Sequence, residues 1–333
     1  MRILVTGGAG YIGSTVTGAL IRNGHRVMVF DNLIHGRQDL LPAGAEFVKG
    51  ELADRQAIEE LFIAAKREGQ PFDGVMHFAA LIEAGESMVR PEAFFRNNTA
   101  CTLSLLEAIL AQGPRRVVFS STAAVYGEPE SIPIKEDARL EPTNAYGESK
   151  LLVEHMLAWF NRIHGLRYAS LRYFNVAGAP EGPEGITSGE SHEPETHLIP
   201  LVLDVALGRR QSIKIFGDDY PTTDGTCIRD YIHVSDLAAA HLLALGALEK
   251  RDRLIFNLGN GRGFSVREVI ESARRVTGHP IPAELCPRRP GDPAVLVASS
   301  EKAMRELGWQ PKYTELDEII RTAWIWHQKR YGR

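Results

Sequence analysis

Short apolar runs alternate with longer amphipathic segments along the first half of the chain. The runs are rich in β-branched and aromatic residues, which favour strands. They cover residues 2–8, 26–32, 46–52, 74–80, 115–121 and 167–178. Between them, apolar residues recur at three- and four-residue spacing, which predicts helices over residues 11–23, 55–68, 91–112 and 144–164. This alternation predicts an α/β fold with a doubly wound parallel sheet that helices cover on both faces.

The alternation stops after about residue 178. Residues 179–196 are rich in glycine, proline, serine and glutamate without a period, which predicts a long surface loop. Beyond them we expect helices near 197–209, 235–249, 265–277, 301–307 and 314–330, and strands near 212–216 and 254–258. The pattern predicts a first domain over 1–178, with part of 229–258 packing back on it, and a smaller mixed α/β domain over 179–333.

Composition narrows the classes of protein to which this chain can belong. Of its 333 residues 44% are hydrophobic, which is enough for a large core, and its 38 basic and 42 acidic residues nearly balance. This balance argues against unspecific binding to nucleic acid or to an anionic membrane. The chain shows neither a signal segment nor an apolar run of about 18 residues, so we expect a soluble, unprocessed protein of the cytoplasm.

The cysteine pattern points away from metal and disulfide chemistry. Cys101, Cys227 and Cys286 are odd in number, widely spaced and without C-x-x-C spacing. This argues against a disulfide framework and a structural zinc site, and it fits a reducing compartment. We therefore predict no metal.

A glycine-rich turn follows the first predicted strand. It reads VTGGAGYIG and places Gly7, Gly8, Gly10 and Gly13 at the start of a predicted helix. Glycines allow close approach of the backbone, so that the N–H groups of the helix N-terminus can hold a pyrophosphate. Asp31 ends the second strand, 18 residues after Gly13, where a carboxylate binds ribose hydroxyls and repels a 2′-phosphate. The pattern favours NAD over NADP; the alternative is a structural glycine turn with a solvated aspartate.

A second pattern pairs a tyrosine with a lysine. Tyr146 and Lys150 are four residues apart on one face of the helix predicted from residue 144. An ammonium group near a phenol favours the phenolate, which makes Tyr146 a candidate general base. The spacing alone is common in amphipathic helices, but here it follows the glycine turn and lies 24 residues after Thr122, at the strand end in FSSTAAVYG.

With these motifs the chain resembles the extended short-chain dehydrogenase/reductase family and, within it, the UDP-glucose 4-epimerases. The resemblance covers nearly the whole chain, through TGGAGYIG, DN, HFAA, GES, NN, FSSTAAVYG, NAYGESK, RYFNVAGA, IFGDDYPTTDGTCIRDYIHV and RRPGD. It implies a Rossmann sheet that binds NAD, a C-terminal domain that binds a UDP-hexose, and a homodimer joined through the Tyr/Lys helix and the long helix before it.

The resemblance also implies roles for individual residues. Tyr146 would accept and donate the proton, Lys150 would hold the nicotinamide ribose and lower the pKa of Tyr146, and Thr122 would bind the sugar hydroxyl. The implied cofactor positions are Gly7, Gly10, Tyr11, Ile12, Gly13, Asp31, Asn32, Glu51, Leu52, Phe78, Ala79, Ala80, Asn97, Ser120, Tyr146, Lys150 and Tyr173. The implied substrate positions are Thr122, Tyr146, Asn175, His197, Leu198, Ile213, Lys214, Ile215, Phe216, Arg229, Arg289 and Asp292.

Four positions depart from the family pattern. Glu51 replaces an aspartate near the adenine, Ile82 replaces a lysine of some members, and His197 replaces an asparagine near the diphosphate. Leu296 stands where a large aromatic residue excludes an N-acetyl group and a small one admits it. Acceptance of N-acetylhexosamines therefore stays open.

Two alanines separate the candidate reactions. In the related 4,6-dehydratases an Asp-Glu pair follows the threonine of this strand end, whereas Ala123 and Ala124 transfer no proton. We therefore expect reversible 4-epimerisation of UDP-glucose and UDP-galactose through a 4-keto sugar. The alternatives are a UDP-N-acetylglucosamine or UDP-uronate 4-epimerase and, outside catalysis, an NAD-sensing regulator.

Overall fold

The computed structural model describes residues 1–289 and 292–332. The chain forms two compact units, and each unit is assembled from three stretches of sequence. Unit 1 comprises Met1–Glu128, Arg139–Arg172 and Ala238–Phe256. Unit 2 comprises Pro129–Ala138, Tyr173–Leu237 and the residues from Asn257 onward.

Unit 1 is built on a sheet that has seven strands over the described residues. The strands are β1 (Arg2–Thr6), β2 (Arg26–Asp31), β3 (Glu46–Lys49), β4 (Gly74–His77), β5 (Arg116–Thr122), β6 (Arg167–Tyr173) and β12 (Arg253–Leu258). Their order is β12-β6-β5-β4-β1-β2-β3, and β1 pairs in parallel with both β2 and β4. Strand order therefore reverses between β1 and β4, and doubly wound sheets bind their ligands at the carboxyl ends beside this switch point.

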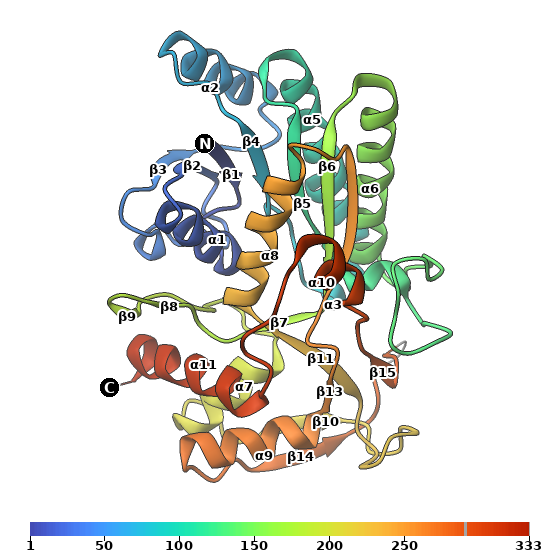
Figure 1. Ribbon diagram of the computed structural model, residues 1–333. Helices are drawn as coiled ribbons and strands as arrows, with labels where there is room; N and C mark the ends of the chain where they lie inside the picture. The colour runs from blue at the N-terminus through green and yellow to red at the C-terminus, as the bar shows by residue number, and fades with distance from the viewer. Residues whose placement is uncertain (290–291, 333) are drawn as a thin grey trace. The chain divides into compact units, whose positions relative to one another are not determined.

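Helices cover both faces of this sheet (Figure 1). They are α1 (Tyr11–Arg22), α2 (Arg55–Arg67), α3 (Ala84–Ser87), α4 (Pro91–Phe94), α5 (Cys101–Gln112), α6 (Ala145–His164) and α8 (Val234–Ala247). Leu4, Val75 and Val117 share one apolar core with α2, α5 and α6. On the other face, a Cβ added at Gly74 would lie 2.9 Å from Cδ1 of Leu245 in α8. Gly74 and Val75 are neighbours in β4 and therefore point to opposite faces of the sheet. Helices thus pack on both faces, and the predicted doubly wound α/β fold is confirmed.

The helix that we predicted over residues 91–112 is not uniform. Between α4 and α5, Phe95–Ala100 form a π-helical turn. Such turns are rare and are often found at functional sites. This turn carries both asparagines of the NN motif.

Unit 2 is a mixed α/β body centred on β11. Its strands are β7 (Asn175–Ala177), β8 (Glu181–Gly182), β9 (Gly185–Ile186), β10 (Ile213–Phe216), β11 (Ile228–His233), β13 (Gly263–Ser265), β14 (Ala283–Cys286) and β15 (Val295–Leu296). Its helices are α7 (Leu198–Ala206), α9 (Val266–Thr277), α10 (Glu301–Leu307) and α11 (Leu316–Tyr331). Strands β7 and β15 run parallel to β11, β13 runs antiparallel to it, and β10 pairs with β14. Apolar side chains of α7, α9 and α11 form a core of their own.

Residues 179–196 differ from the predicted surface loop. They include the β8–β9 hairpin, and both Gly189 and Glu190 are buried. A Cβ added at Gly189 would lie 2.5 Å from the indole ring of Trp326, and the indole N–H of Trp326 donates to the carbonyl of Glu190 at 2.8 Å. The second half of this segment therefore packs against α11. The polar composition of the segment predicted an exposed loop and gave no sign of this packing.

None of the helices in the described ranges is long and apolar enough to cross a membrane.

Candidate active site

The glycine turn brings the ends of β1 and β4 into close approach. Gly7 has φ +72°, and a Cβ there would lie 2.4 Å from the backbone nitrogen of Ala79. A Cβ at Gly13 would lie 2.2 Å from the carbonyl oxygen of Gly7, so neither position accepts a side chain. Helix α1 then begins after Gly10, and no side chain of the described residues caps this end. The N–H groups of the first helical turn, at Tyr11, Ile12 and Gly13, therefore suit an anionic ligand.

Asp31 is fixed beside this turn. Its carboxylate accepts from the N–H of Ala9 at 3.0 Å and from the N–H of Leu33 at 2.8 Å. The residue is buried at the carboxyl end of β2, and each carboxylate oxygen keeps capacity for a further donor. Nearby, the side-chain amide of Asn32 donates to Glu51 at 3.1 Å, so two predicted adenosine-side residues lie together. Leu52 directly follows Glu51.

The residues after β4 are held by the π-helical turn. The N–H groups of Phe78 and Ala79 both donate to the carbonyl of Thr6, and Ala80 follows them. Asn97 donates to the side chain of Asn98 at 2.9 Å. Asn98, which sequence reasoning did not select, bonds to both backbone groups of Leu81 and to the hydroxyl of Ser149 in α6. It ties the loop after β4 to the helix that carries the Tyr/Lys pair.

Thr122 and Tyr146 meet at the ends of β5 and α6. The side chain of Thr122 lies near the Tyr146 phenol and acts to lower its pKa. The hydroxyl of Thr122 also accepts the N–H of Ala124 at 3.1 Å. A Cβ at Gly147 would lie 2.6 Å from the carbonyl oxygen of Ala124, so the start of α6 packs directly on the turn that follows β5. The structure therefore joins two of the predicted catalytic residues.

The Lys150 ammonium group is directed elsewhere. Its Nζ atom donates to the carbonyl of Ser120 at 2.9 Å and lies 5.0 Å from the ring centroid of Phe119. Burial lowers the pKa of Lys150 to about 7 and raises the pKa of Tyr146 to about 12. Desolvation is the largest cause of the Tyr146 shift among the described groups, and it outweighs the opposing effect of Thr122 on this pKa. The predicted lowering of the Tyr146 pKa by Lys150 stays a prediction.

A buried ion pair supports the same strand end. Ser121 donates to Glu154 at 2.6 Å, and Arg172 pairs with Glu154 at 2.6 Å and donates to the hydroxyl of Tyr126 at 2.9 Å. Glu154 and Arg172 are both nearly inaccessible to solvent. This network couples β5, β6 and α6. The charged residue within the apolar stretch LLVEHMLAWF of α6 is the sequence signal that points to it.

In unit 2 the predicted substrate residues form a group around β11 and β10. Arg229 pairs with Asp292. The N–H of Asp292 donates to the carbonyl of Arg289 at 3.3 Å, and the guanidinium group of Arg289 lies 4.0 Å from the ring centroid of Phe216. Asn175 begins β7 and pairs with Tyr231 in the ladder between β7 and β11. Two cationic groups and an aromatic ring therefore gather in one region of this unit.

In strand β10, buried side chains alternate with side chains that are accessible to solvent. Ile213 and Ile215 are buried in the core of unit 2, whereas Lys214 is exposed and Phe216 is half-buried. Only the last two can offer side chains to a ligand. Of the other predicted positions, Tyr173 ends β6 and Leu198 begins α7.

His197 directly precedes α7, and its Nδ1 atom faces two carboxylates, Glu190 at 2.8 Å and Glu195 at 3.1 Å. Leu296 pairs with Arg229 in the ladder between β15 and β11. Leu296, the position that in the family decides whether an N-acetyl group fits, thus lies beside Arg229, a predicted substrate residue.

The chain is similar to known proteins along its whole length. It matches the NAD dependent epimerase/dehydratase family over residues 3–259. A UDP-glucose 4-epimerase of Streptomyces lividans is 54% identical over 326 residues, which are 98% of this chain and 96% of the relative. A crystal structure of a UDP-glucose 4-epimerase is 50% identical, with a TM-score of 0.94, and covers 100% of this chain and 99% of that chain. A crystal structure of the UDP-glucose 4-epimerase from Brucella ovis in complex with NAD is 44% identical, with a TM-score of 0.92, and covers 99% of this chain and 98% of that chain. The chain therefore belongs to the NAD-dependent epimerase/dehydratase family.

Proposed function

We propose that the protein interconverts UDP-glucose and UDP-galactose by oxidation and reduction at C4, through a transient 4-keto sugar. The observation that carries the proposal is the arrangement at the ends of β5 and α6. Thr122 lies near the Tyr146 phenol, Lys150 follows one helical turn later, and Ala123 and Ala124 stand where a dehydratase needs acids. The identity to enzymes named UDP-glucose 4-epimerase supports the same reaction.

The residues of unit 1 fit NAD. The uncapped start of α1 suits the pyrophosphate, and Asp31 suits ribose hydroxyls and repels a 2′-phosphate. Bound NAD supplies the acceptor for the C4 hydride, the donor that returns it, and a positive charge. Because the reaction is redox-neutral overall, we expect the cofactor to stay bound through the cycle.

Tyr146 moves the proton of the reaction. Its phenolate takes the proton of the 4-hydroxyl during oxidation, and its phenol returns a proton during reduction. Thr122 orients the same hydroxyl. Since burial keeps Tyr146 protonated at neutral pH in the ligand-free protein, deprotonation requires positive charge that arrives with the ligands.

In unit 2 we assign the UDP part of the substrate to the group around Arg229. The guanidinium groups of Arg229 and Arg289 suit the diphosphate, and Asp292 suits ribose hydroxyls. The ring of Phe216, already stacked with Arg289, suits the uracil.

We also propose a homodimer in the cytoplasm. Leu103 of α5 and Trp159 and Ile163 of α6 expose 38%, 58% and 63% of their surface, and a second copy of the chain would bury them. Light scattering after gel filtration should give twice the chain mass, and Trp159→Asp should give the monomer. The three free cysteines fit a reducing compartment.

One substrate assay tests the proposed reaction. The purified protein is supplied in turn with UDP-glucose, UDP-galactose, UDP-N-acetylglucosamine and a UDP-uronate, and the products are separated chromatographically. We expect interconversion of the first two without net formation of NADH. Conversion of the N-acetylated or uronate sugar alone would contradict the proposed substrate. Tight NAD binding without any turnover would favour the regulator.

A further inference from the structure

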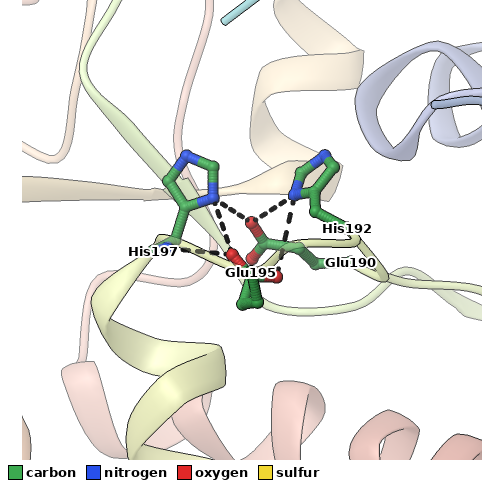
Figure 2. A group of neighbouring side chains, drawn as sticks. All are labelled: Glu190, His192, Glu195 and His197. Carbon is green, nitrogen blue, oxygen red and sulfur yellow. Dashed lines mark hydrogen bonds and ion pairs between the residues drawn. The ribbon is translucent and has the colours of Figure 1, made fainter. Parts of the chain in front are cut away.

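Four ligand-type side chains meet in the segment before α7. The segment reads ESHEPETH over residues 190–197, and Glu-x-His occurs in it twice, as Glu190 with His192 and as Glu195 with His197. One ligand atom from each side chain lies within 4.8 Å of the others. Figure 2 shows both carboxyl groups turned towards the two imidazole rings. All four residues belong to unit 2.

The separations between these atoms suit tetrahedral coordination. A carboxylate oxygen of Glu190 lies 3.2 Å from Nδ1 of His192 and 2.8 Å from Nδ1 of His197. Oxygens of Glu195 lie 3.7 Å and 3.1 Å from the same two nitrogens. With bonds of about 2.1 Å, neighbouring ligands of a tetrahedral zinc ion lie about 3.4 Å apart. The observed separations lie on both sides of this value, the two from Glu195 being measured from its two different oxygens.

The cluster also buries the negative charge of two carboxylates. The side chains of Glu190 and Glu195 are only 8% and 13% exposed, and no lysine or arginine of the described residues pairs with either. Two imidazolium rings can balance two carboxylates, and so can one dication with two neutral imidazoles. The second arrangement satisfies all four ligand atoms at a single point.

We propose that Glu190, His192, Glu195 and His197 form a structural Zn²⁺ site. Imidazole and carboxylate ligands suit zinc, and four protein ligands close the coordination sphere, as structural sites require. We predicted no metal from the spacing of the cysteines, and that spacing gives no information about a site made of histidine and glutamate ligands.

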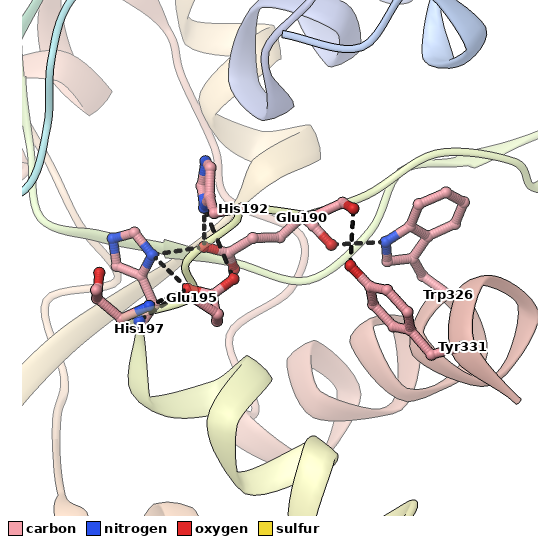
Figure 3. A network of polar contacts seen from close by, with 8 residues as sticks. Glu190, His192, Glu195, His197, Trp326 and Tyr331 are labelled. Carbon is pink, nitrogen blue, oxygen red and sulfur yellow. Dashed lines mark hydrogen bonds and ion pairs between the residues drawn. The ribbon is translucent and has the colours of Figure 1, made fainter. Parts of the chain in front are cut away.

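Outer contacts hold the ligands in place (Figure 3). The carbonyl of Glu190 accepts the indole N–H of Trp326 at 2.8 Å, and the hydroxyl of Ser191 lies 2.7 Å from that of Tyr331. Glu195 accepts the N–H of His197 at 2.8 Å, which fixes one ligand against another. Such contacts orient metal ligands and raise affinity. The zinc ion would fasten the start of α7 to the segment that α11 holds.

Metal content and geometry test the site without any assay of activity. Wild-type protein is stripped with a chelator, dialysed, and loaded with Zn²⁺ or with Co²⁺. We expect one ion per chain by mass spectrometry of the metal, a higher Tm in the zinc-loaded protein, and the intense visible absorption of tetrahedral Co²⁺. Folded wild-type protein that takes up no Zn²⁺ at micromolar concentration, or that gives an octahedral cobalt spectrum, would overturn the proposal.

Variants assign the ligands. We expect His192→Asn to weaken Zn²⁺ binding by more than about a hundredfold, since loss of an outer-shell contact alone costs 10–100-fold. His155→Asn, at an exposed histidine of α6, is the matched control and should bind as the wild type does. Circular dichroism establishes that each variant is folded. Equal zinc affinity of His192→Asn and wild type would exclude this ligand set. If a variant does not fold, the cobalt spectrum of the wild-type protein still tests the site.

Discussion

The start of α6 with Tyr146 and Lys150, which we propose as the catalytic end, and the segment Glu190–His197 both bury ionisable side chains, but burial has opposite outcomes in the two regions. At the catalytic end it raises the pKa of Tyr146 to about 12 and lowers that of Lys150 to about 7, so both residues are driven towards their neutral forms. In the segment, burial is outweighed by facing opposite charges. These hold the pKa of Glu190 well below and that of His197 well above the ordinary value. The proposed catalytic region needs charge from its ligands, whereas in the segment without a metal ion the imidazole rings balance the carboxylates.

The largest expected effect follows from removing the phenol of Tyr146. Tyr146→Phe should lower kcat by about 10²–10⁴-fold, which is the usual contribution of a positioned general acid or base. Steady-state epimerisation rates measure it. The variant should still bind UDP, as calorimetry can establish, because unit 2 is unchanged. A kcat within twofold of the wild-type value would remove Tyr146 from the reaction.

The second prediction concerns the buried ion pair between Glu154 and Arg172, from which one partner is removed. Glu154→Gln leaves the buried guanidinium group of Arg172 without its counterion and should lower the free energy of unfolding by about 3–5 kcal/mol. Urea denaturation measures the change. Glu141→Gln is the control, because the pair between Arg139 and Glu141 is exposed and should contribute less than about 1 kcal/mol. Equal losses in the two variants would refute the distinction.

The smallest effect concerns Lys150 in the ligand-free protein. Its pKa lies near 7 in the folded state and near 10.5 in the unfolded state, so between these pH values the unfolded chain binds an extra proton and stability rises with pH. Below pH 7 the folded protein holds a buried ammonium group at a cost. At pH 6, Lys150→Met should therefore raise the free energy of unfolding by about 1–2 kcal/mol, net of the lost hydrogen bond to Ser120.

The gain from Lys150→Met should shrink at pH 9. Urea denaturation at the two pH values measures the difference, and Lys135→Met, at an exposed lysine, should show none. A variant less stable than wild type at pH 6, with no dependence on pH, would contradict the desolvation of Lys150.

Hydrophobic periodicity predicted the sheet of unit 1 and the helices on its two faces, because these elements are long enough to show a period. It missed β8, β9, β13 and β15, which have only two or three residues each, and also the longer strands β11 and β14. The glycine turn and the pairing of Tyr146 with Thr122 were accessible because both depend on local spacing after a strand. Asn98 was missed because its partner Ser149 lies 51 residues away.

Two further predictions depend on features that a motif does not show. The resemblance implied that Ile213 and Ile215 bind the substrate, but their side chains are buried, so such a contact would involve their backbone. The predicted effect of Lys150 on Tyr146 stays a prediction, and burial, which opposes it, depends on the whole fold and not on the spacing of the two residues.

The discontinuous make-up of unit 1 also affects how the chain is synthesised. Its edge strand β12 begins at Arg253, after the ribosome has passed the long stretch Tyr173–Leu237 that belongs to unit 2. Until then β6 has no neighbour on its outer side, and a nascent chain exposes an unpaired sheet edge that invites association with other chains. A transcript truncated before residue 253 should therefore yield an aggregation-prone product rather than a free nucleotide-binding domain.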